Sequence, residues 1–432
     1  MQRTLYNAAL HLLTPVVLLR LFWRARRAPA YRQRIAERFG HGPAIDGPSP
    51  LWIHAVSVGE VQAASPLVAH LRRRHPELPV LVTTTTPTGA EQVRRLFGEE
   101  VMHRYLPYDL PAAVDRFLDA VRPRLGLVME TEIWPNLFRC CRVRGVPLLM
   151  ANARLSRRSH DRYARVRRLV AETLADVTGI AAQTEADRDR FVALGAPPER
   201  VRVCGNTKFD LEVPASVREQ AEAVRAQWGV QRPVLLAAST HAGEESVVLE
   251  AFAQVRLRYP DALLVLVPRH PERFDEVAAL VGQRGLPFVR RSSGQGVGGA
   301  IPVYLVDTMG ELQLLYGTAD VAFIGGSLVP AGGHNPLEAA ALGVPCLFGP
   351  HMENAEHVRD LLLEAGAAET VASARGLASR VIDWFGDPAE RNRRGEQGAA
   401  VVAANRGARE CVLAHVERLL PRSSCKPGGE AA

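Results

Sequence analysis

The sequence has very little lysine and few aromatic residues. Only Lys208 and Lys426 are lysines among its 53 basic residues, and 6% of the chain is aromatic. Nucleic-acid-binding surfaces combine a cationic stripe with aromatic platforms for the bases, whereas the arginines here are dispersed along the chain. We therefore expect no nucleic-acid partner, although the formal net charge of +7 still favours an anionic ligand or an acidic membrane.

Closely spaced cysteines are also missing. The six cysteines stand at positions 140, 141, 204, 346, 411 and 425, with no CxxC pair and no zinc-finger spacing. The histidines that follow strand-like runs, His241, His270 and His334, lack the spacing of a zinc site as well. These absences predict reduced, cytoplasmic thiols and no bound metal.

Long apolar runs are absent except at the N-terminus, from Leu5 to Trp23. That run approaches the roughly 20 residues that cross a bilayer, and no small-residue cleavage site follows it, which disfavours a removed signal peptide. Arginines at 24, 26, 27, 32 and 34 come next and would stay on the cytoplasmic side of a membrane. We expect residues 1–24 to form a membrane-anchoring helix that spans the bilayer or lies in its interface; a buried N-terminal helix is the alternative.

Short apolar runs alternate with longer helical patterns over the rest of the chain. This alternation predicts an α/β protein with parallel sheets covered by helices on both faces. This alternation occurs twice along the chain, so we expect two Rossmann-like domains, 25–205 and 233–420. We expect a linker at 206–232 between them and a disordered tail at 421–432. The strand-like runs are 51–56, 80–84, 124–129, 147–151 and 180–183, then 234–238, 263–267, 303–306, 321–324 and 345–348.

A glycine-rich segment from Ala331 to Ala340 follows the apolar run 321–326. Asn335 is placed to cap a helix, with Pro336 at its first position and the Glu338 carboxylate at its third. Unpaired backbone N–H groups at such a helix start bind anions, and Glu338 is placed to reach ribose hydroxyls. The spacing matches neither a Walker loop nor a dinucleotide fingerprint. The segment is thus either a phosphate and nucleotide site or a tight turn before an ordinary amphipathic helix.

Other polar residues directly follow the predicted strands, where open parallel sheets bind their ligands. Glu60 follows the first strand and has capping-box spacing from Ser57, so it is either a helix cap or a general base. Glu130 and Glu132 follow the third strand, and alternation along an extended strand end would put them on one face, where like charges raise a carboxylate pKa. In the second half, Lys208 and Arg269 are either counter-charges for phosphate or carboxylate, or ordinary surface cations.

Several of these motifs, in one order along nearly the whole chain, resemble those of the 3-deoxy-D-manno-octulosonic acid (Kdo) transferases. One departure is Ala339, where the family pattern usually has proline; alanine is easily accommodated inside a helix, so we expect no change in chemistry. The matching segments are the basic anchor, His54 to Glu60, Glu130 to Asn136, Gly205 to Asp210, Pro268 to Glu272 and the glycine-rich segment.

The resemblance implies a GT-B fold, in which the two Rossmann-like domains face each other across a cleft. It implies inverting transfer of Kdo from CMP-Kdo to the lipid A precursor, a tetraacyldisaccharide 4′-phosphate, at the cytoplasmic face of the inner membrane, with no cofactor and no metal. The implied roles are Glu60 as general base and Glu130 and Lys208 as stabilisers of the transition state. CMP would be held by Pro268, Arg269, Met309, Gly310, Glu311, Asn335, Pro336, Leu337 and Glu338.

Two other functions are compatible with the same residues. A glycosyltransferase using another nucleotide sugar, such as a UDP-hexose, would need the same anion cradle and the same ribose-binding carboxylate. A membrane-tethered regulatory protein that binds anions without catalysis would also be basic.

Overall fold

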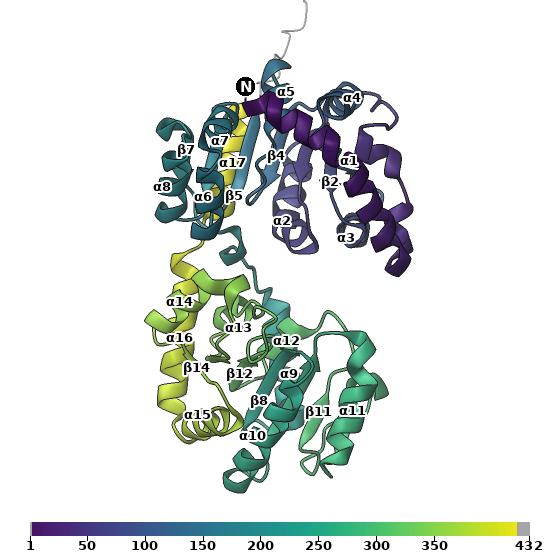
Figure 1. Ribbon diagram of the computed structural model, residues 1–432. Coiled ribbons are helices and arrows are strands. Elements are labelled where there is room, and N and C mark those ends of the chain that lie inside the picture. Colours follow the sequence, from purple (N-terminus) through teal and green to yellow (C-terminus); the bar gives the residue numbers. More distant parts are fainter. Residues whose placement is uncertain (1, 421–432) are drawn as a thin grey trace, which may run out of the picture. The chain divides into compact units, whose positions relative to one another are not determined.

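The structure is a computed structural model that describes residues 2–420, and it divides the chain into two compact units. Unit 1 runs to Thr207 and also contains the segment from Arg406, whereas unit 2 runs from Lys208 to Asn405. Each unit contains one seven-stranded parallel sheet with helices on its faces (Figure 1). The expected α/β class with two Rossmann-like halves is confirmed, while the expected tail at 421–432 lies outside the described residues.

The sheet of unit 1 has the strand order β3-β2-β1-β4-β5-β6-β7. Its central strands are buried on both faces, which explains why their sequences are largely continuous runs of apolar residues. The strands are β1 (Leu51–His54), β2 (Val80–Thr84), β3 (Met102–Tyr105), β4 (Leu125–Met129), β5 (Leu148–Ala153), β6 (Gly179–Ala182) and β7 (Val201–Val203). The helices are α1 (Gln2–Arg27), α2 (Val58–Arg74), α3 (Pro87–Phe97), α4 (Pro111–Val121), α5 (Pro135–Val143), α6 (Arg157–Ala164), α7 (Arg167–Leu174), α8 (Glu185–Ala193) and α17 (Ala408–Leu419).

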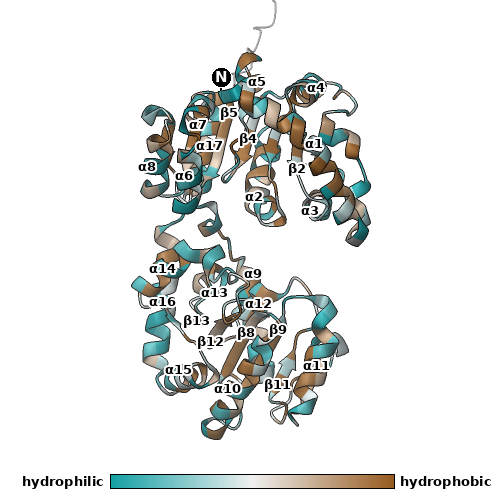
Figure 2. Ribbon diagram, in the orientation of Figure 1, coloured by the Kyte–Doolittle hydropathy of each residue, from teal (hydrophilic) through white to brown (hydrophobic). Residues whose placement is uncertain are grey.

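The sheet of unit 2 has the order β10-β11-β9-β8-β12-β13-β14 and separates two apolar clusters. Figure 2 shows its strands as hydrophobic, with helices of mixed character around them. The strands are β8 (Val234–Thr240), β9 (Leu263–Pro268), β10 (Phe288–Arg290), β11 (Val303–Leu305), β12 (Val321–Ile324), β13 (Cys346–Phe348) and β14 (Ala368–Thr370). The helices are α9 (Ala215–Trp228), α10 (Glu244–Arg258), α11 (Phe274–Gln283), α12 (Leu312–Tyr316), α13 (Leu337–Ala341), α14 (Glu356–Glu364), α15 (Ala374–Gly386) and α16 (Pro388–Ala404).

Both sheets reverse their strand order beside their first strand, between β1 and β4 in unit 1 and between β8 and β12 in unit 2. At such a switch point the loops beyond the carboxyl ends of the two strands diverge and leave room for a ligand. In unit 1 these loops begin at residues 55 and 130, and in unit 2 at residues 241 and 325. Among the residues predicted from the sequence, Glu60 and Glu130 follow β1 and β4, and the glycine-rich segment follows β12. Arg269 follows β9, the neighbour of β8, whereas Met309–Glu311 follow β11 and Lys208 follows β7.

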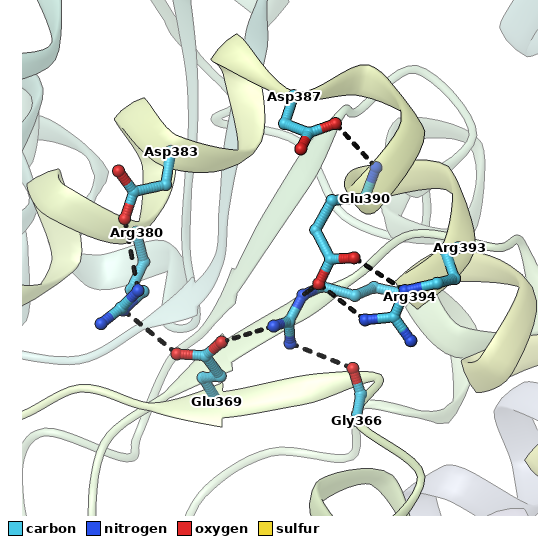
Figure 3. Close-up of polar contacts among 8 residues, drawn as sticks. All are labelled: Gly366, Glu369, Arg380, Asp383, Asp387, Glu390, Arg393 and Arg394. Atoms are coloured by element: carbon cyan, nitrogen blue, oxygen red, sulfur yellow. Dashed lines mark hydrogen bonds and ion pairs between the residues drawn. The ribbon is translucent and has the colours of Figure 1, made fainter.

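An ionic network covers the edge strand β14 of unit 2 (Figure 3). Glu369 on this strand pairs with Arg380 of α15 at 3.1 Å and with Arg394 of α16 at 2.8 Å. Arg394 also pairs with Glu390 at 2.8 Å and donates to the carbonyl of Gly366 at 3.0 Å. Charged side chains of this kind prevent an edge strand from pairing with another chain.

The domain boundaries differ from those expected. Residues 215–228 form α9, which packs Ala221 and Trp228 into unit 2, so 206–232 is not a linker over its whole length. Helix α17, coloured yellow in Figure 1, packs beside β5 and β6 of unit 1, so the segment from Arg406 does not belong to the expected domain 233–420.

Cys204 and Cys411 form a disulfide, contrary to the expectation of reduced thiols. The two cysteines are 207 residues apart in the sequence. They come together because α17 returns to unit 1, and no short-range spacing could have indicated this. Cys140, Cys141 and Cys346 are free.

Helix α1 is the one helix within residues 2–420 that is long and apolar enough to cross a membrane. Its large side chains face solvent, among them Leu12 at 79% and Leu19 at 70% exposure, and Figure 2 shows hydrophobic residues along its length. This exposure excludes the alternative of an ordinary buried helix, because a buried helix covers its apolar side chains with protein. Helix α1 is thus a candidate membrane anchor.

Candidate active site

Glu60 lies in the first turn of α2, directly after β1. Its backbone N–H donates to the Ser57 hydroxyl at 3.4 Å, and that hydroxyl donates to the Glu60 carboxylate at 3.2 Å. The other carboxylate oxygen accepts from the N–H of Val56 at 2.9 Å. The capping interaction expected from the sequence is therefore present.

The same carboxylate also has the ionisation behaviour of a base. The pKa of Glu60 is raised to about 7, chiefly by burial. The charges of Glu130 and Glu132 also raise this pKa, whereas the hydrogen bonds from Val56 and Ser57 lower it. Burial likewise raises the pKa of Glu132 to about 7. A base that titrates near neutral pH is well matched to proton transfer at that pH, so Glu60 is able to act as both cap and base.

A stability measurement can detect this raised pKa. The carboxyl pKa of Glu60 is raised in the folded chain relative to its ordinary value of 4.5, so ionisation destabilises the fold. Above pH 7, we expect the free energy of unfolding of Glu60→Gln to exceed that of the parent chain by an amount of the order of 2 kcal/mol, so that the variant unfolds at higher temperature. The difference should shrink as the pH falls from 7 to 4.5. Thermal unfolding of both chains across this range checks it, and a pH-independent difference would contradict the raised pKa.

Glu130 does not lie on an extended strand end, as expected from the sequence. Strand β4 ends at Met129, and Glu130 has a left-handed backbone with φ of 56°. Glu132 accepts from the indole N–H of Trp134 at 2.9 Å. Both carboxylates still raise the pKa of Glu60, and Glu130 also raises that of Glu132, because the turn after β4 brings these side chains together. Glu132 is thus part of the carboxylate cluster, although no specific role was expected for it.

His54, the last residue of β1, is a further buried polar group near these carboxylates. Its Nδ1 contacts the Thr83 hydroxyl at 3.0 Å, while its Nε2 has no hydrogen-bond partner within residues 2–420. Burial lowers the pKa of His54 to about 4, so the ring is neutral. Its ring lies edge-on to Trp134, with 6.5 Å between the ring centroids.

The glycine-rich segment of unit 2 begins its helix later than expected. Helix α13 starts at Leu337, not Pro336, and spans five residues. The capping position is therefore Pro336 and not Asn335 as expected, although the Asn335 side-chain oxygen accepts from the N–H of Leu337 at 3.2 Å. Gly333 requires glycine: its φ is 72°, and a Cβ at this position would lie 2.3 Å from the sulfur of Met352.

Part of the expected anion cradle is already filled by a side chain of the protein. The fully buried Glu244, at the start of α10, accepts from the backbone N–H groups of Gly326, Ser327 and Leu328 at 2.6–2.9 Å, and from that of His241 at 2.8 Å. These amides hold a carboxylate and so fix the loops after β8 and β12. These amides are therefore not available to a phosphate.

Three histidines and one arginine form a basic cluster at the carboxyl ends of β8 and β9 and in the loop after β12. The Nε2 atoms of His241 and His334 lie 2.9 Å apart in stacked rings, and His270 lies edge-on to His241 at 5.1 Å. The pKa of His334 is lowered to about 4, chiefly by burial and in smaller part by the neighbouring His241 and Arg269. The ring N–H groups of this cluster and the exposed guanidinium of Arg269 are suited to bind an anion.

Glu338 is a mostly buried carboxylate whose side chain makes no hydrogen bond or ion pair within residues 2–420. Burial raises its pKa above the ordinary value. A polar group that is removed from water needs a partner, and a pair of ligand hydroxyls would provide one. The contact between Glu338 and a ribose, expected from the sequence, stays a prediction.

The remaining predicted residues are placed as follows. Pro268 ends β9, and Met309 and Gly310 lie in the loop after β11, which pairs with β9. The carboxylate of Glu311 is bound by Arg291 at 2.7 Å, which lowers the Glu311 pKa. The backbone of Glu311, and not its carboxylate, is therefore the part available to contact a nucleotide.

Lys208 is the first residue of unit 2 and lies in a single helical turn, Thr207–Phe209. Phe209 anchors this turn in the core of unit 2, where it is 1% exposed. Glu130 belongs to unit 1, so these two predicted stabilising residues are held by different units.

Known proteins similar to this chain point to one family. Residues 33–211 match the model of the 3-deoxy-D-manno-octulosonic-acid transferase (kdotransferase) family. A 3-deoxy-D-manno-octulosonic acid transferase of Haemophilus influenzae is 40% identical over 98% of this chain and 100% of its own length, and one of Bordetella pertussis is 39% identical over 96% and 99%. A solved UDP-GlcNAc 2-epimerase from Neisseria meningitidis, 15% identical, covers 85% of this chain and 99% of its own with a TM-score of 0.57.

The structural likeness confirms the expected GT-B fold class. The carboxylate cluster of unit 1 follows β1 and β4, and the basic cluster of unit 2 follows β8, β9 and β12. Identity of 39–40% over essentially the full length of both chains identifies the family. This chain belongs to the 3-deoxy-D-manno-octulosonic acid transferases, which are glycosyltransferases.

Proposed function

We propose that this protein transfers Kdo from CMP-Kdo to the lipid A precursor, the tetraacyldisaccharide 4′-phosphate, with inversion at the anomeric carbon. Membership of the Kdo transferase family supports the sugar and the reaction class. The observation that carries the mechanism is the Glu60 carboxylate, which is buried beside two other carboxylates at the switch point of unit 1 and has a pKa of about 7.

The proposed reaction is a single displacement. The acceptor hydroxyl oxygen bonds to the anomeric carbon of Kdo as the bond from that carbon to the phosphate oxygen breaks. The hydroxyl proton passes to Glu60, and the electron pair of the broken bond leaves with CMP. Lys208 and Glu130 stabilise the charges that develop in the transition state.

The donor would be held by unit 2. Arg269, beside Pro268, and the backbone from Asn335 to Leu337 bind the phosphate of CMP, and Glu338 binds its ribose. The segment from Met309 to Glu311 contributes backbone contacts. The phosphate of CMP-Kdo already makes a stable leaving group, so the transfer itself requires neither a metal nor a cofactor.

Mass spectrometry of the lipid A precursor after incubation with CMP-Kdo and this protein tests the activity. The expected product is heavier by one or more Kdo residues, and the mass reports how many are added. The same incubation with UDP-hexoses should leave the precursor unchanged. Transfer from a UDP-hexose but not from CMP-Kdo would overturn the proposed donor.

A pH profile tests how the carboxylates of unit 1 cooperate. Glu132 raises the pKa of Glu60, so Glu132→Gln should move the acidic limb of the kcat/KM profile to lower pH. The parent chain should lose activity as the pH falls through about 7, because the base becomes protonated. The two profiles, measured at equal ionic strength, provide the check; an unshifted limb would contradict coupling between the two groups.

We also propose that α1 lies in the interface of the inner membrane, on its cytoplasmic side, rather than spanning it. Near its N-terminal end, Arg3 pairs with Asp176 at 3.4 Å and Tyr6 donates to Asp109 at 2.9 Å. Near its C-terminal end, Leu21 and Ala25 are buried. A helix that contacts the same unit near both ends cannot cross a bilayer without losing one set of contacts, whereas its exposed apolar side chains suit the interface.

Accessibility from the two sides of the membrane distinguishes these arrangements. Gln2→Cys in the full chain should react with a membrane-impermeant maleimide in inverted inner-membrane vesicles and remain unlabelled in intact spheroplasts. The parent chain sets the background from its native cysteines. Labelling of residue 2 from the outside would show that α1 spans the membrane.

A further inference from the structure

Three potential metal ligands converge in unit 1 outside the candidate active site. Cys204 directly follows β7, while Cys411 and His415 lie one turn apart on α17 and so share one face of that helix. The two sulfurs and one ring nitrogen of His415 all lie within 4.8 Å of one another, and the three side chains are partly buried.

His415 also has a ring nitrogen that lacks a polar partner in the described part of the chain, which is independent of the distances between the three ligands. Its Nε2 is buried without a hydrogen-bond partner within residues 2–420. A buried ring nitrogen that lacks a partner is costly to maintain, and a ligand bound by the ring removes this cost. None of the roles proposed for the transferase reaction uses this residue.

The chemistry of the three ligands favours zinc. Two thiolates and one imidazole, with a water molecule in the fourth position, make up a well-known ligand set for Zn²⁺. The disulfide between Cys204 and Cys411 excludes such a complex, because both sulfurs are already bonded. The site therefore has two exclusive states, a disulfide and a dithiol.

We propose that Cys204, Cys411 and His415 form a redox-dependent zinc site. A dithiol reductant cleaves the disulfide: its two thiols become a disulfide, and Cys204 and Cys411 each gain one electron and one proton. Zn²⁺ then binds the two sulfurs and His415, and the two cysteine protons are released. In the reverse step, a disulfide oxidant takes two electrons from the two thiolates and becomes two thiols, while the Cys204–Cys411 disulfide forms again and Zn²⁺ is released.

The place of the site in the fold gives it a structural role. Cys204 lies three residues before Thr207, where the chain leaves unit 1, and Cys411 lies five residues after Arg406, where the chain returns. The zinc complex and the disulfide both join β7 to α17, so the crossing segments remain attached to unit 1 in either redox state. In a reducing cytoplasm, zinc would replace a bond that is rare there.

Metal titration of the full-length protein in two redox states tests the proposal. After reduction and removal of the reductant without air, the parent chain should bind one Zn²⁺ in competition with a chromophoric chelator. Co²⁺ should give thiolate charge-transfer bands and the visible bands of a tetrahedral complex. The same chain oxidised with diamide should bind neither metal at this site. Equal binding in both states, or binding in neither, would overturn the proposal without depending on any mutant.

Variants then identify the ligands. Cys204→Ser and Cys411→Ser should abolish the thiolate charge-transfer bands, and His415→Gln should weaken zinc binding at least about tenfold. Cys140→Ser is the matched control, because Cys140 is a partly buried free cysteine of the same unit; it should bind zinc like the parent chain. Loss of zinc only in Cys140→Ser, or unchanged zinc affinity in His415→Gln, would contradict the assigned ligands.

Discussion

Glu60→Gln should lower kcat by about 10²–10⁴-fold, the usual contribution of a general base, while the affinity for CMP stays unchanged. Glutamine keeps the hydrogen bond from the N–H of Val56 and thus preserves the helix cap, but it cannot accept the acceptor proton. Steady-state kinetics with CMP-Kdo and the lipid A precursor, together with calorimetric titration of CMP, measure the two effects.

Asp187 offers a matched control in the same unit. It occupies the corresponding capping position on α8, where its N–H donates to Thr184 at 3.1 Å and its carboxylate accepts from the N–H of Leu155 at 2.9 Å. Asp187→Asn should reduce the stability of unit 1 and leave kcat within a few-fold of the parent value. A Glu60→Gln variant that retains near-parental kcat would reduce Glu60 to a helix cap.

Glu338→Ala should weaken CMP binding by about 10–100-fold, since a hydrogen bond to a charged group contributes about 1.5–3 kcal/mol. The carboxylate makes no hydrogen bond within the described part of the chain and is largely buried, so ligand hydroxyls are its natural partners. Titration with 2′,3′-dideoxy-CMP isolates this contact, because that ligand lacks both ribose hydroxyls. The parent chain should bind it weakly, and Glu338→Ala should cause little further loss.

Glu353→Gln is the control for this second prediction. Glu353 is an exposed carboxylate in the neighbouring single-turn helix Glu353–Ala355, where it pairs with His351 at 3.6 Å. Its replacement should leave the affinity for both nucleotides unchanged. Equal losses of CMP and dideoxy-CMP affinity in Glu338→Ala would mean that the residue supports the loop and does not touch the ribose.

The interior strands of both sheets could be predicted from the sequence, whereas the edge strands could not. Strands β2 and β12 have the bounds expected from their apolar runs, because a strand buried on both faces must be apolar at every position. The four strands that were not predicted, β3, β7, β10 and β14, are the edges of the two sheets. They are short and carry polar residues such as Arg202 and Glu369, so they lack a continuous apolar run.

Most of the candidate site followed from one rule, that polar residues directly after parallel strands share an edge of the sheet. This rule selected Glu60, Glu130 and Arg269, whereas Glu338 was predicted from the glycine-rich segment. It did not show that Glu244 would fill the backbone amides after β12, because a buried carboxylate in the first turn of a helix looks in sequence like an ordinary helix-start acid. The left-handed turn at Glu130 was also missed, since glutamate rarely adopts it.

The sequence by itself determined the α/β class, the two sheets, the apolar N-terminal helix and the family, because apolar periodicity and ordered motifs are local properties of the chain. Only the tertiary structure decided that α17 belongs to unit 1, that Cys204 meets Cys411 beside His415, and that Glu60 titrates near pH 7. These properties depend on burial and on distances between residues far apart in the sequence, so they arise only when the chain has folded.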